Sequence, residues 1–155
     1  MSRIHGVVTG QVTSVDDPDN QGRVQVSFPF LGGQNKSTWA PVATLMAGSS
    51  RGSWFMPEVG DEVLVAFNQG SVEHPFVIGF LWNGQDTPPE TDNEIRTLVT
   101  PGGHSLRFED KDGSKKVIVK SSSDQTITLD DTDSSITLQG GGRILKMSNG
   151  LVQIS

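Results

Sequence analysis

Five branched aliphatic residues recur at intervals of nine near the C-terminus, namely Ile118, Ile127, Ile136, Leu145 and Ile154. The residues between them are mostly small, polar or charged. Three members of this series have an apolar partner two residues further on: Leu129, Leu138 and Met147. An apolar residue at every second position is typical of a strand with one buried face, so each unit predicts a short strand and a turn.

A single chain cannot easily bury this series. Two aliphatic side chains per unit recover only part of the conformational entropy that ordering the unit costs. The strands of one chain would form a thin sheet with one apolar face and unpaired edges, which stacked units with a shared core would avoid. The spacing therefore indicates an assembly of several chains.

Two architectures would supply a shared core: a single-chain β-solenoid, or three chains that each supply one wall of a triangular prism. A solenoid usually needs about 20 or more residues per turn, whereas one nine-residue unit fits one side of a triangle. A calcium-binding nonapeptide repeat has the same period but requires Gly-Gly-x-Gly-x-Asp in each unit, and residues 140–142 provide such glycines once, without the Asp. We therefore predict a homotrimeric β-prism, an intertwined triple-stranded β-helix. Its predicted core is Ile118, Ile127, Leu129, Ile136, Leu138, Leu145 and Met147.

Longer β-like runs occupy the first half of the chain. They cover residues 7–15, 22–28, 39–45, 61–67 and 75–82, and turn-forming residues separate them. Five strands of this length suit a small barrel, in which closure removes the exposed edges. The run 75–82 is apolar almost throughout and is therefore predicted to be buried on both faces.

A polar segment with two prolines, residues 84–93, separates the two regions and predicts an extended linker. The predicted organisation of this all-β chain is a barrel domain over residues 1–83, a linker over 84–98 and a spike over 99–155.

Composition excludes several classes of function. The absence of cysteine excludes disulfides and thiolate metal sites, and no run of about 18 apolar residues predicts a membrane span. Residues 1–92 carry 4 Lys/Arg against 10 Asp/Glu, a net charge of −6, while residues 93–155 carry 8 against 8. The acidic first region argues against a nucleic-acid groove, which needs a basic stripe.

Three clusters of carboxylates are candidate sites. The clusters at residues 16–19 and 130–133 could each ligate a cation, but both patterns favour polar turns. The carboxylates at 58–62 could form an acid–base pair, although a solvated turn before a strand accounts for them better. We predict no catalytic residue, no cofactor and no metal site.

Aromatic side chains in the first region could stack bases in the groove of a barrel. Only four basic residues accompany them in residues 1–92, which favours packing in a core or an interface. Trp54, Phe55 and Met56 follow a Gly-Ser pair and are the best candidates for an exposed apolar contact. A staple on the barrel core is an equal alternative for them.

The first region also carries short phrases in a fixed order. They include Asp17-Pro18 before Gly22-Arg23-Val24, then Thr38-Trp39-Ala40-Pro41-Val42, Pro57-Glu58-Val59-Gly60-Asp61-Glu62-Val63 and His74-Pro75. Over residues 4–83, their order and spacing resemble the OB-fold domain of phage baseplate spike proteins, the baseplate assembly protein V group, and of the related VgrG proteins of type VI secretion. The remainder, from Gly102 onward, resembles the β-prism that follows this domain in such spikes.

The resemblance implies a five-stranded OB-fold collar and a non-enzymatic homotrimeric spike at the centre of a contractile baseplate. The parent particle would be a phage, an extracellular injection system or a type VI apparatus. A separate hub protein is expected, with Trp54, Phe55 and Met56 as its possible contacts, and the needle would meet the target membrane transiently. A PAAR-type tip protein is expected to bind the last strand, at Leu151, Val152, Gln153, Ile154 and Ser155. No nucleic-acid partner is expected.

The expected mechanism is mechanical, with every strand tied to strands of other chains so that many hydrogen bonds share the force. The protein is expected to be made in the bacterial cytoplasm without a signal peptide and assembled into the baseplate of a virion or tail-like particle. The alternative is an OB-fold module that binds single-stranded nucleic acid or carbohydrate, which the charge of residues 1–92 disfavours. A polysaccharide-degrading tail spike would need a longer solenoid than residues 99–155 can build.

Overall fold

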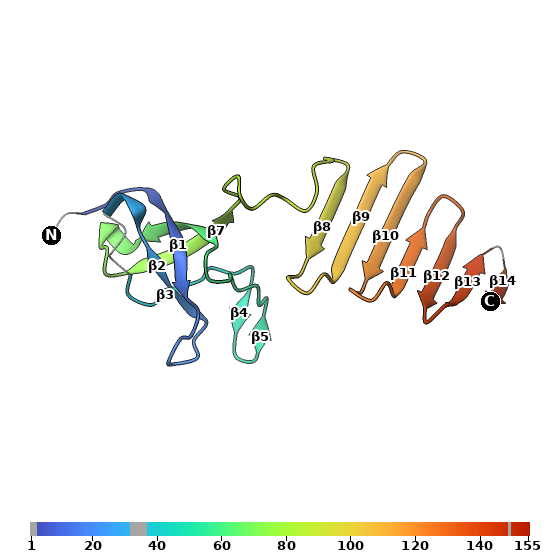
Figure 1. Ribbon diagram of the computed structural model, residues 1–155, viewed down its shortest axis with the longest axis horizontal. Helices are drawn as coiled ribbons and strands as arrows, with labels where there is room; N and C mark the ends of the chain where they lie inside the picture. The colour runs from blue at the N-terminus through green and yellow to red at the C-terminus, as the bar shows by residue number, and fades with distance from the viewer. Residues whose placement is uncertain (1–2, 32–36, 149) are drawn as a thin grey trace. The chain divides into compact units, whose positions relative to one another are not determined.

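The computed structural model describes residues 3–31, 37–148 and 150–155. It is all-β apart from two short 3₁₀ segments, η1 (Pro29–Leu31) and η2 (Asn68–Gly70). The chain divides into two compact units, Met1–Thr87 and Pro88–Ser155 (Figure 1). Within the described ranges, no helical segment is long or apolar enough to cross a bilayer.

The first unit is a curled sheet of five strands in the order β3-β2-β1-β6-β7. Their bounds are β1 (Val7–Ser14), β2 (Arg23–Ser27), β3 (Ala40–Pro41), β6 (Glu62–Phe67) and β7 (Pro75–Leu81). The segment just after β3 pairs with β7, the strand at the other end of the sheet. Val42 forms a parallel bridge with Val77, and the Ala43 N–H donates to the Val77 carbonyl at 2.8 Å. The curled sheet is consistent with the predicted OB-fold barrel.

Alternation builds the core of the first unit. In β6, residues at every second position are buried and their neighbours are half-buried, as expected for a strand with one face turned inward. The buried set is mostly β-branched, a residue type that packs well on a pleated surface. It consists of Val12, Val24, Val26, Phe28, Ala40, Val63, Val65, Phe67 and Val77.

The prediction that residues 75–82 are buried on both faces is wrong. Pro75 and Val77 are buried, but Phe76 and Ile78 on the same strand are 40% and 45% exposed. A barrel closed from a single sheet has one inner face, so an apolar run in it leaves half its side chains outside. The outer face of β7 is therefore an exposed apolar strip.

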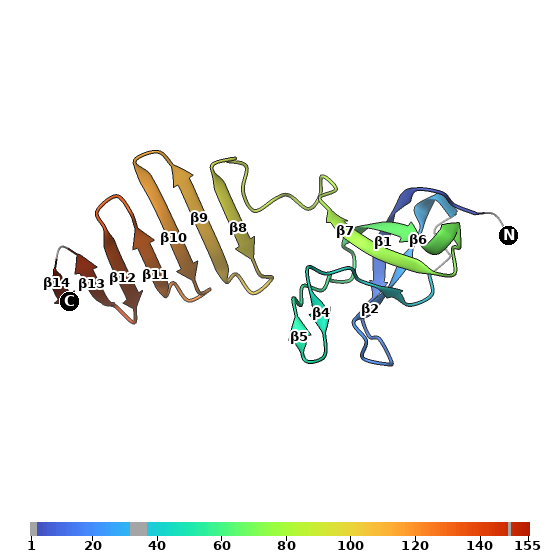
Figure 2. The ribbon, with the colours of Figure 1, turned by 180° about the vertical axis from the view of Figure 1, so that it is seen from behind.

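A short hairpin interrupts the barrel between β3 and β6. It consists of β4 (Ala47–Gly48) paired with β5 (Arg51–Gly52), and it stands out from the barrel in Figures 1 and 2. Only the start of the predicted strand 39–45 is in the sheet, because the chain leaves the barrel for this hairpin.

The second unit is one sheet of seven antiparallel strands, each hydrogen-bonded to its neighbours in sequence. The strands are β8 (Ile95–Val99), β9 (Ser105–Lys111), β10 (Ser114–Lys120), β11 (Thr126–Asp130), β12 (Ser135–Gly140), β13 (Arg143–Ser148) and β14 (Leu151–Ile154). Figure 2 shows this meander from behind. We expected each strand to bond to strands of other chains. In the structure, these strands bond to their neighbours in the same chain.

The predicted linker 84–98 contains all of β8 except Val99, so the sheet begins earlier than expected. The residues just before β8 are also held by the sheet. Glu90 forms an ion pair with Arg107 at 3.0 Å, and Asp92 forms one with Lys111 at 2.7 Å. The Asp110 N–H donates to the Glu94 carbonyl at 2.9 Å. Composition alone hid these contacts, because polar residues that pair across a sheet look like a solvated linker.

Gly10 in β1 provides a test of the barrel packing. A Cβ at Gly10 would overlap Val26 and come within 2.9 Å of the Ser27 carbonyl, so Gly10→Ala forces β1 and β2 apart. We expect a loss of about 1–3 kcal/mol in the free energy of unfolding. Urea unfolding followed by tryptophan fluorescence measures it, because all three tryptophans lie in the first unit.

Gly79→Ala is the matched control for this change. Gly79 also lies in a strand of the barrel, but a Cβ there would meet no atom within 4 Å. We expect no loss of stability in this variant, and an equal loss in both variants would contradict the packing argument.

Candidate assembly surfaces

One face of the sheet in the second unit is apolar over most of its strands, and an ion pair between Arg96 and Asp110 lies on it near β8. Cross-strand pairing places Val117 opposite Leu129, Ile127 opposite Leu138, Ile136 opposite Met147 and Leu145 opposite Ile154. Earlier strands extend the same face through Leu98 opposite Leu106 and Val117 opposite Phe108. We call this surface the apolar face.

Water reaches the apolar face in the isolated chain. Ile127, Leu129 and Ile136 are 43%, 41% and 39% exposed, which is unusual for aliphatic residues at the centre of a sheet. Part of the face forms an open hollow of about 760 Å³, whose apolar lining includes Ile127, Leu138 and Leu145. Contiguous apolar surface of this kind marks an interaction site.

The structure brings six of the seven predicted core residues onto the apolar face, and Ile118 is the exception. Ile118 lies opposite Arg107 on one side and Thr128 on the other, so it belongs to the other face. Its neighbours Val117 and Val119 take its place. The connection 121–125 between β10 and β11 has an odd number of residues, whereas 131–134 between β11 and β12 has an even number. Residues nine apart share a face only across a connection with an even number of residues, so Ile118 and Ile127 lie on opposite faces.

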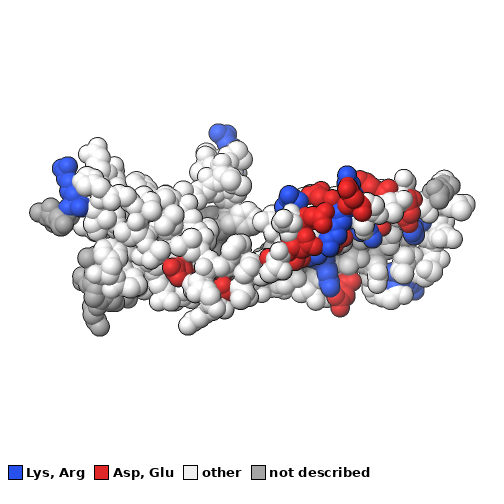
Figure 3. Space-filling view, turned by 90° about the horizontal axis from the view of Figure 1, so that it is seen from above, with Lys and Arg blue, Asp and Glu red and all other residues white. Residues whose placement is uncertain are grey.

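The opposite face of the sheet is polar, and its charges are paired. Lys116 contacts Asp130 at 2.9 Å, Lys146 contacts Asp133 at 2.7 Å, and Arg107 contacts Glu109 at 2.8 Å. Lys116 lowers the pKa of Asp130, and Lys146 lowers the pKa of Asp133. Acidic and basic side chains are interleaved over this unit in Figure 3. The polar turn predicted at residues 130–133 is therefore tied to the sheet by ion pairs.

The residues predicted to contact a tip protein continue the sheet. Ser155 exchanges two backbone hydrogen bonds with Ile144, at 2.8 and 2.9 Å. Leu151, Val152 and Ile154 are 63%, 65% and 79% exposed. By register, Val152 and Ile154 extend the apolar face while Leu151 lies on the other side. The contact with a tip protein remains a prediction.

A second exposed apolar surface lies on the first unit, in residues 44–56, which we call the hairpin arm. Trp54 and Phe55 are 73% and 59% exposed, and Leu45 is almost fully exposed. Met56, in contrast, packs against the barrel core. The two interpretations of the Trp54-Phe55-Met56 sequence thus apply to different residues: Met56 is the staple, and the two aromatic residues are available for contact.

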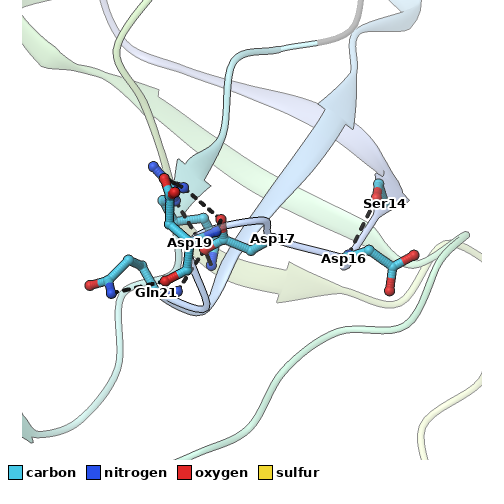
Figure 4. A network of polar contacts seen from close by, with 6 residues as sticks. Ser14, Asp16, Asp17, Asp19 and Gln21 are labelled. Atoms are coloured by element: carbon cyan, nitrogen blue, oxygen red, sulfur yellow. Dashed lines mark hydrogen bonds and ion pairs between the residues drawn. The ribbon is translucent and has the colours of Figure 1, made fainter.

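The carboxylates at residues 16–19 form a turn around Asp17 (Figure 4). The Asp17 carboxylate accepts hydrogen bonds from the backbone N–H groups of Asp19, Gln21 and Arg23 at 3.1, 2.8 and 3.2 Å. It also accepts one from Arg23 Nε at 3.0 Å. The Arg23 guanidinium, together with these N–H donors, holds the pKa of Asp17 well below its usual range. These bonds confirm the predicted turn.

The acidic cluster at residues 58–62 is also a turn, in which the Glu58 N–H donates to the Asp61 carboxylate at 2.9 Å. Among the described residues, no three His, Cys, Asp or Glu side chains are grouped so that they could hold a metal ion. Phe28 and Phe67 lie in the barrel core with their ring centroids 5.6 Å apart, whereas Phe80 and Trp82 are exposed. Some aromatic residues of the barrel therefore pack in its core, and others lie on its outer surface.

Comparison with known proteins gives a consistent picture. Residues 8–82 match the family described as the type VI secretion system/phage-baseplate injector OB domain. The type VI secretion system spike protein VgrG3 of Vibrio cholerae is 33% identical over 118 residues, which cover 68% of this chain and 12% of that protein. Spike protein VgrG5 of Pseudomonas aeruginosa is 34% identical over 131 residues, covering 76% and 17%.

The actin cross-linking toxin VgrG1 of Vibrio cholerae is also similar, with 30% identity over 118 residues that cover 68% of this chain and 11% of the toxin. The chain thus matches less than a fifth of the length of each of these three proteins. A match to so small a part of the toxin gives no reason to assign toxin activity to this chain.

The turn around Asp17 predicts a specific response to acid. Because its pKa is lowered by folding, the charged Asp17 stabilises the first unit fully above the unfolded pKa of about 3.9. That stabilisation is lost as the pH falls toward the lower folded value. Asp17→Asn should therefore lower Tm by several degrees at neutral pH. The further decrease of Tm on acidification should be smaller in this variant than in the parent protein. Thermal unfolding followed by tryptophan fluorescence at a series of pH values measures both effects.

Asp16→Asn is the control for the Asp17 variant. The Asp16 carboxylate points away from the turn in Figure 4, so its neutralisation should leave the acid response close to that of the parent protein. Identical Tm–pH curves for the parent and Asp17→Asn would show that Arg23 does not hold a charged Asp17.

Proposed function

Because residues 8–82 belong to the family of type VI secretion system and phage-baseplate injector OB domains, we propose that this chain is one subunit of a homotrimeric spike in a contractile injection system. The relatives named above include proteins described as type VI spike proteins. The first unit would be the collar of such a spike and the second unit its needle.

The apolar face of the second unit carries the proposal of a trimer. A sheet with one apolar and one polar face is stable in water when another layer covers the apolar side. Three copies arranged as a triangular prism would turn three such faces inward and leave three polar faces in water. The side chains of Ile127, Ile136 and Leu145 would then meet their counterparts from two other copies around the axis.

The polar face supports a role as the outer wall of a needle. Its lysines are paired with aspartates of the same chain at Lys116–Asp130 and Lys146–Asp133, so no external partner is needed to neutralise them. In this proposal the needle acts mechanically. Hydrogen bonds within each sheet and apolar contacts between the three walls keep it rigid as it pierces the target envelope. No enzymatic step is required of the chain.

Two further contacts belong to the same proposal. The exposed Trp54 and Phe55 of the hairpin arm would face a hub protein. The exposed strand β14, with Leu151, Val152 and Ile154, would receive a PAAR-type tip protein. The acidic surroundings of the aromatic residues in the first unit argue against the alternative role of binding single-stranded nucleic acid.

Solution mass tests the proposed trimer. Light scattering coupled to size exclusion should give about three times the 16.6 kDa of one chain, because the apolar face is covered only in an assembly. A mass of 16.6 kDa at micromolar concentration would exclude the prism.

Adjacent residues of β10 test which face lies inside. Val117→Asp places a charge on the apolar face, where burial in the trimer would be costly, so it should abolish trimers. Ile118→Asp places the same charge on the polar face and should leave the mass unchanged. The reverse outcome would mean that the nine-residue series, rather than the strand register, identifies the core.

A further inference from the structure

Two adjacent hollows lie where the hairpin arm meets the turn between β1 and β2. The arm hollow, of about 590 Å³, is lined by the apolar Val42, Met46 and Phe55 together with polar residues and the basic Arg51. The turn hollow, of about 370 Å³, is lined by Asp16, Asp17 and Pro57 among others. Gly22, Trp54 and Met56 line both hollows, so Trp54 stands at their boundary.

Trp54 is held in place although it is 73% exposed. A Cβ at Gly22 would lie 2.8 Å from Cζ3 of the indole, so the ring packs directly on the glycine backbone. Gly22 has a φ of +68°, which is a second reason for glycine at this position. The turn thus presents the indole at the surface instead of covering it.

The hairpin arm is held by its own hydrogen bonds. Thr44 Oγ1 donates to the Ser53 carbonyl at 2.8 Å, and the Ser53 N–H donates to the Met46 carbonyl at 3.0 Å. Both bonds close the base of the hairpin around the arm hollow. A surface held in this way loses little conformational entropy when a ligand binds.

The two hollows differ in the ligand chemistry that they favour. An apolar side chain would fill the arm hollow between Met46 and Phe55. In the turn hollow, the indole of Trp54 and the carboxylates of Asp16 and Asp17 share the lining, and this combination favours a cationic group. Asp17 is already occupied by Arg23, but the Asp16 carboxylate points away from that network in Figure 4.

Charge decides between a second copy of this chain and a different partner. Residues 1–87 contain 4 Lys/Arg and 8 Asp/Glu, a net charge of −4, and Asp16 and Asp17 line the turn hollow, so two copies that met through their turn hollows would repel each other there. Nucleic acid is excluded by the same sign of charge. A basic partner is attracted.

We propose that the two hollows together bind a short segment of a partner protein in which a lysine or arginine adjoins a large apolar residue. The cationic side chain lies against Trp54 and Asp16, and the apolar side chain enters the arm hollow. The inference rests on the proposed function insofar as the hub supplies this segment, and it defines the chemistry of that contact.

Two fluorescein-labelled peptides of equal length test the proposal against the full chain. One alternates lysine and leucine, the other glutamate and leucine, and fluorescence anisotropy measures their binding. We expect saturable binding of the lysine peptide, weakened by salt, and at least tenfold weaker binding of the glutamate peptide. Equal affinities for the two peptides, or no saturable binding of the lysine peptide, would overturn the proposal.

Four variants locate the binding site. Trp54→Ala should weaken binding of the lysine peptide about tenfold or more, as loss of a central aromatic anchor does. Trp82→Ala removes another exposed tryptophan, which is 67% exposed, and should leave the affinity unchanged. Asp16→Asn should weaken binding about two- to fivefold, and Glu73→Gln, which removes the same charge elsewhere on this unit, should not. Undiminished binding by Trp54→Ala would place the site elsewhere and overturn the proposal.

Light scattering on the same samples separates the two proposals. A trimer that does not bind the lysine peptide overturns the docking site and leaves the spike intact. A monomer that binds the peptide selectively overturns the spike and leaves the docking site.

Discussion

A sheet one layer thick has two faces, and an apolar face needs something to cover it. The chain meets this constraint in two ways. The first unit curls its five strands until their inner sides cover one another, and Val42 meets Val77 where the curl closes. The second unit keeps its seven strands as an uncurled meander, and Ile127 and Ile136 stay accessible. A unit of the first kind buries its inner apolar face within one chain, whereas one of the second kind leaves its apolar face accessible to water.

The two faces of the second unit would have different roles in the proposed needle. Apolar side chains on one face can hold copies together without directional bonds, while ion pairs on the other face are satisfied within one chain. The hairpin arm gives the first unit a contact surface of a different character, in which an indole lies beside carboxylates. In the proposed spike, assembly along the second unit would therefore depend on apolar burial, and docking at the first unit would depend on charge complementarity.

Much of this organisation could be predicted from the sequence, because it follows from the alternation of apolar and polar residues. The five short strands β10 to β14 of the second unit were visible in this way, as were most members of the apolar face. Ile118 lies on the face opposite the other six residues, because the nine-residue spacing carries no information on whether a turn has an odd or even number of residues. β8 was missed because its flanking charges resemble a linker until Arg107 and Lys111 are seen to pair with them.

The site on the hairpin arm was harder to predict for a related reason. Trp54, Phe55 and Met56 have the same apolar character in sequence, but only the fold shows that Met56 turns to the core while Trp54 rests on Gly22. The role of Asp17 was easier, because an Asp-Pro turn bonds to its own backbone. Local hydrogen bonding is thus readable from sequence, while contacts between distant loops are not.

The meander in the second unit has a consequence for how the protein is made. Every strand pairs with its neighbours in sequence, so each wall can form hairpin by hairpin from local contacts, which fold quickly. In the proposed trimer, closure of the three walls would instead require chains to meet and would depend on their concentration. Between these two steps the apolar face is open to any other sheet, a state prone to aggregation. If the proposed trimer forms, the concentration of newly made chains would therefore set how long that vulnerable interval lasts.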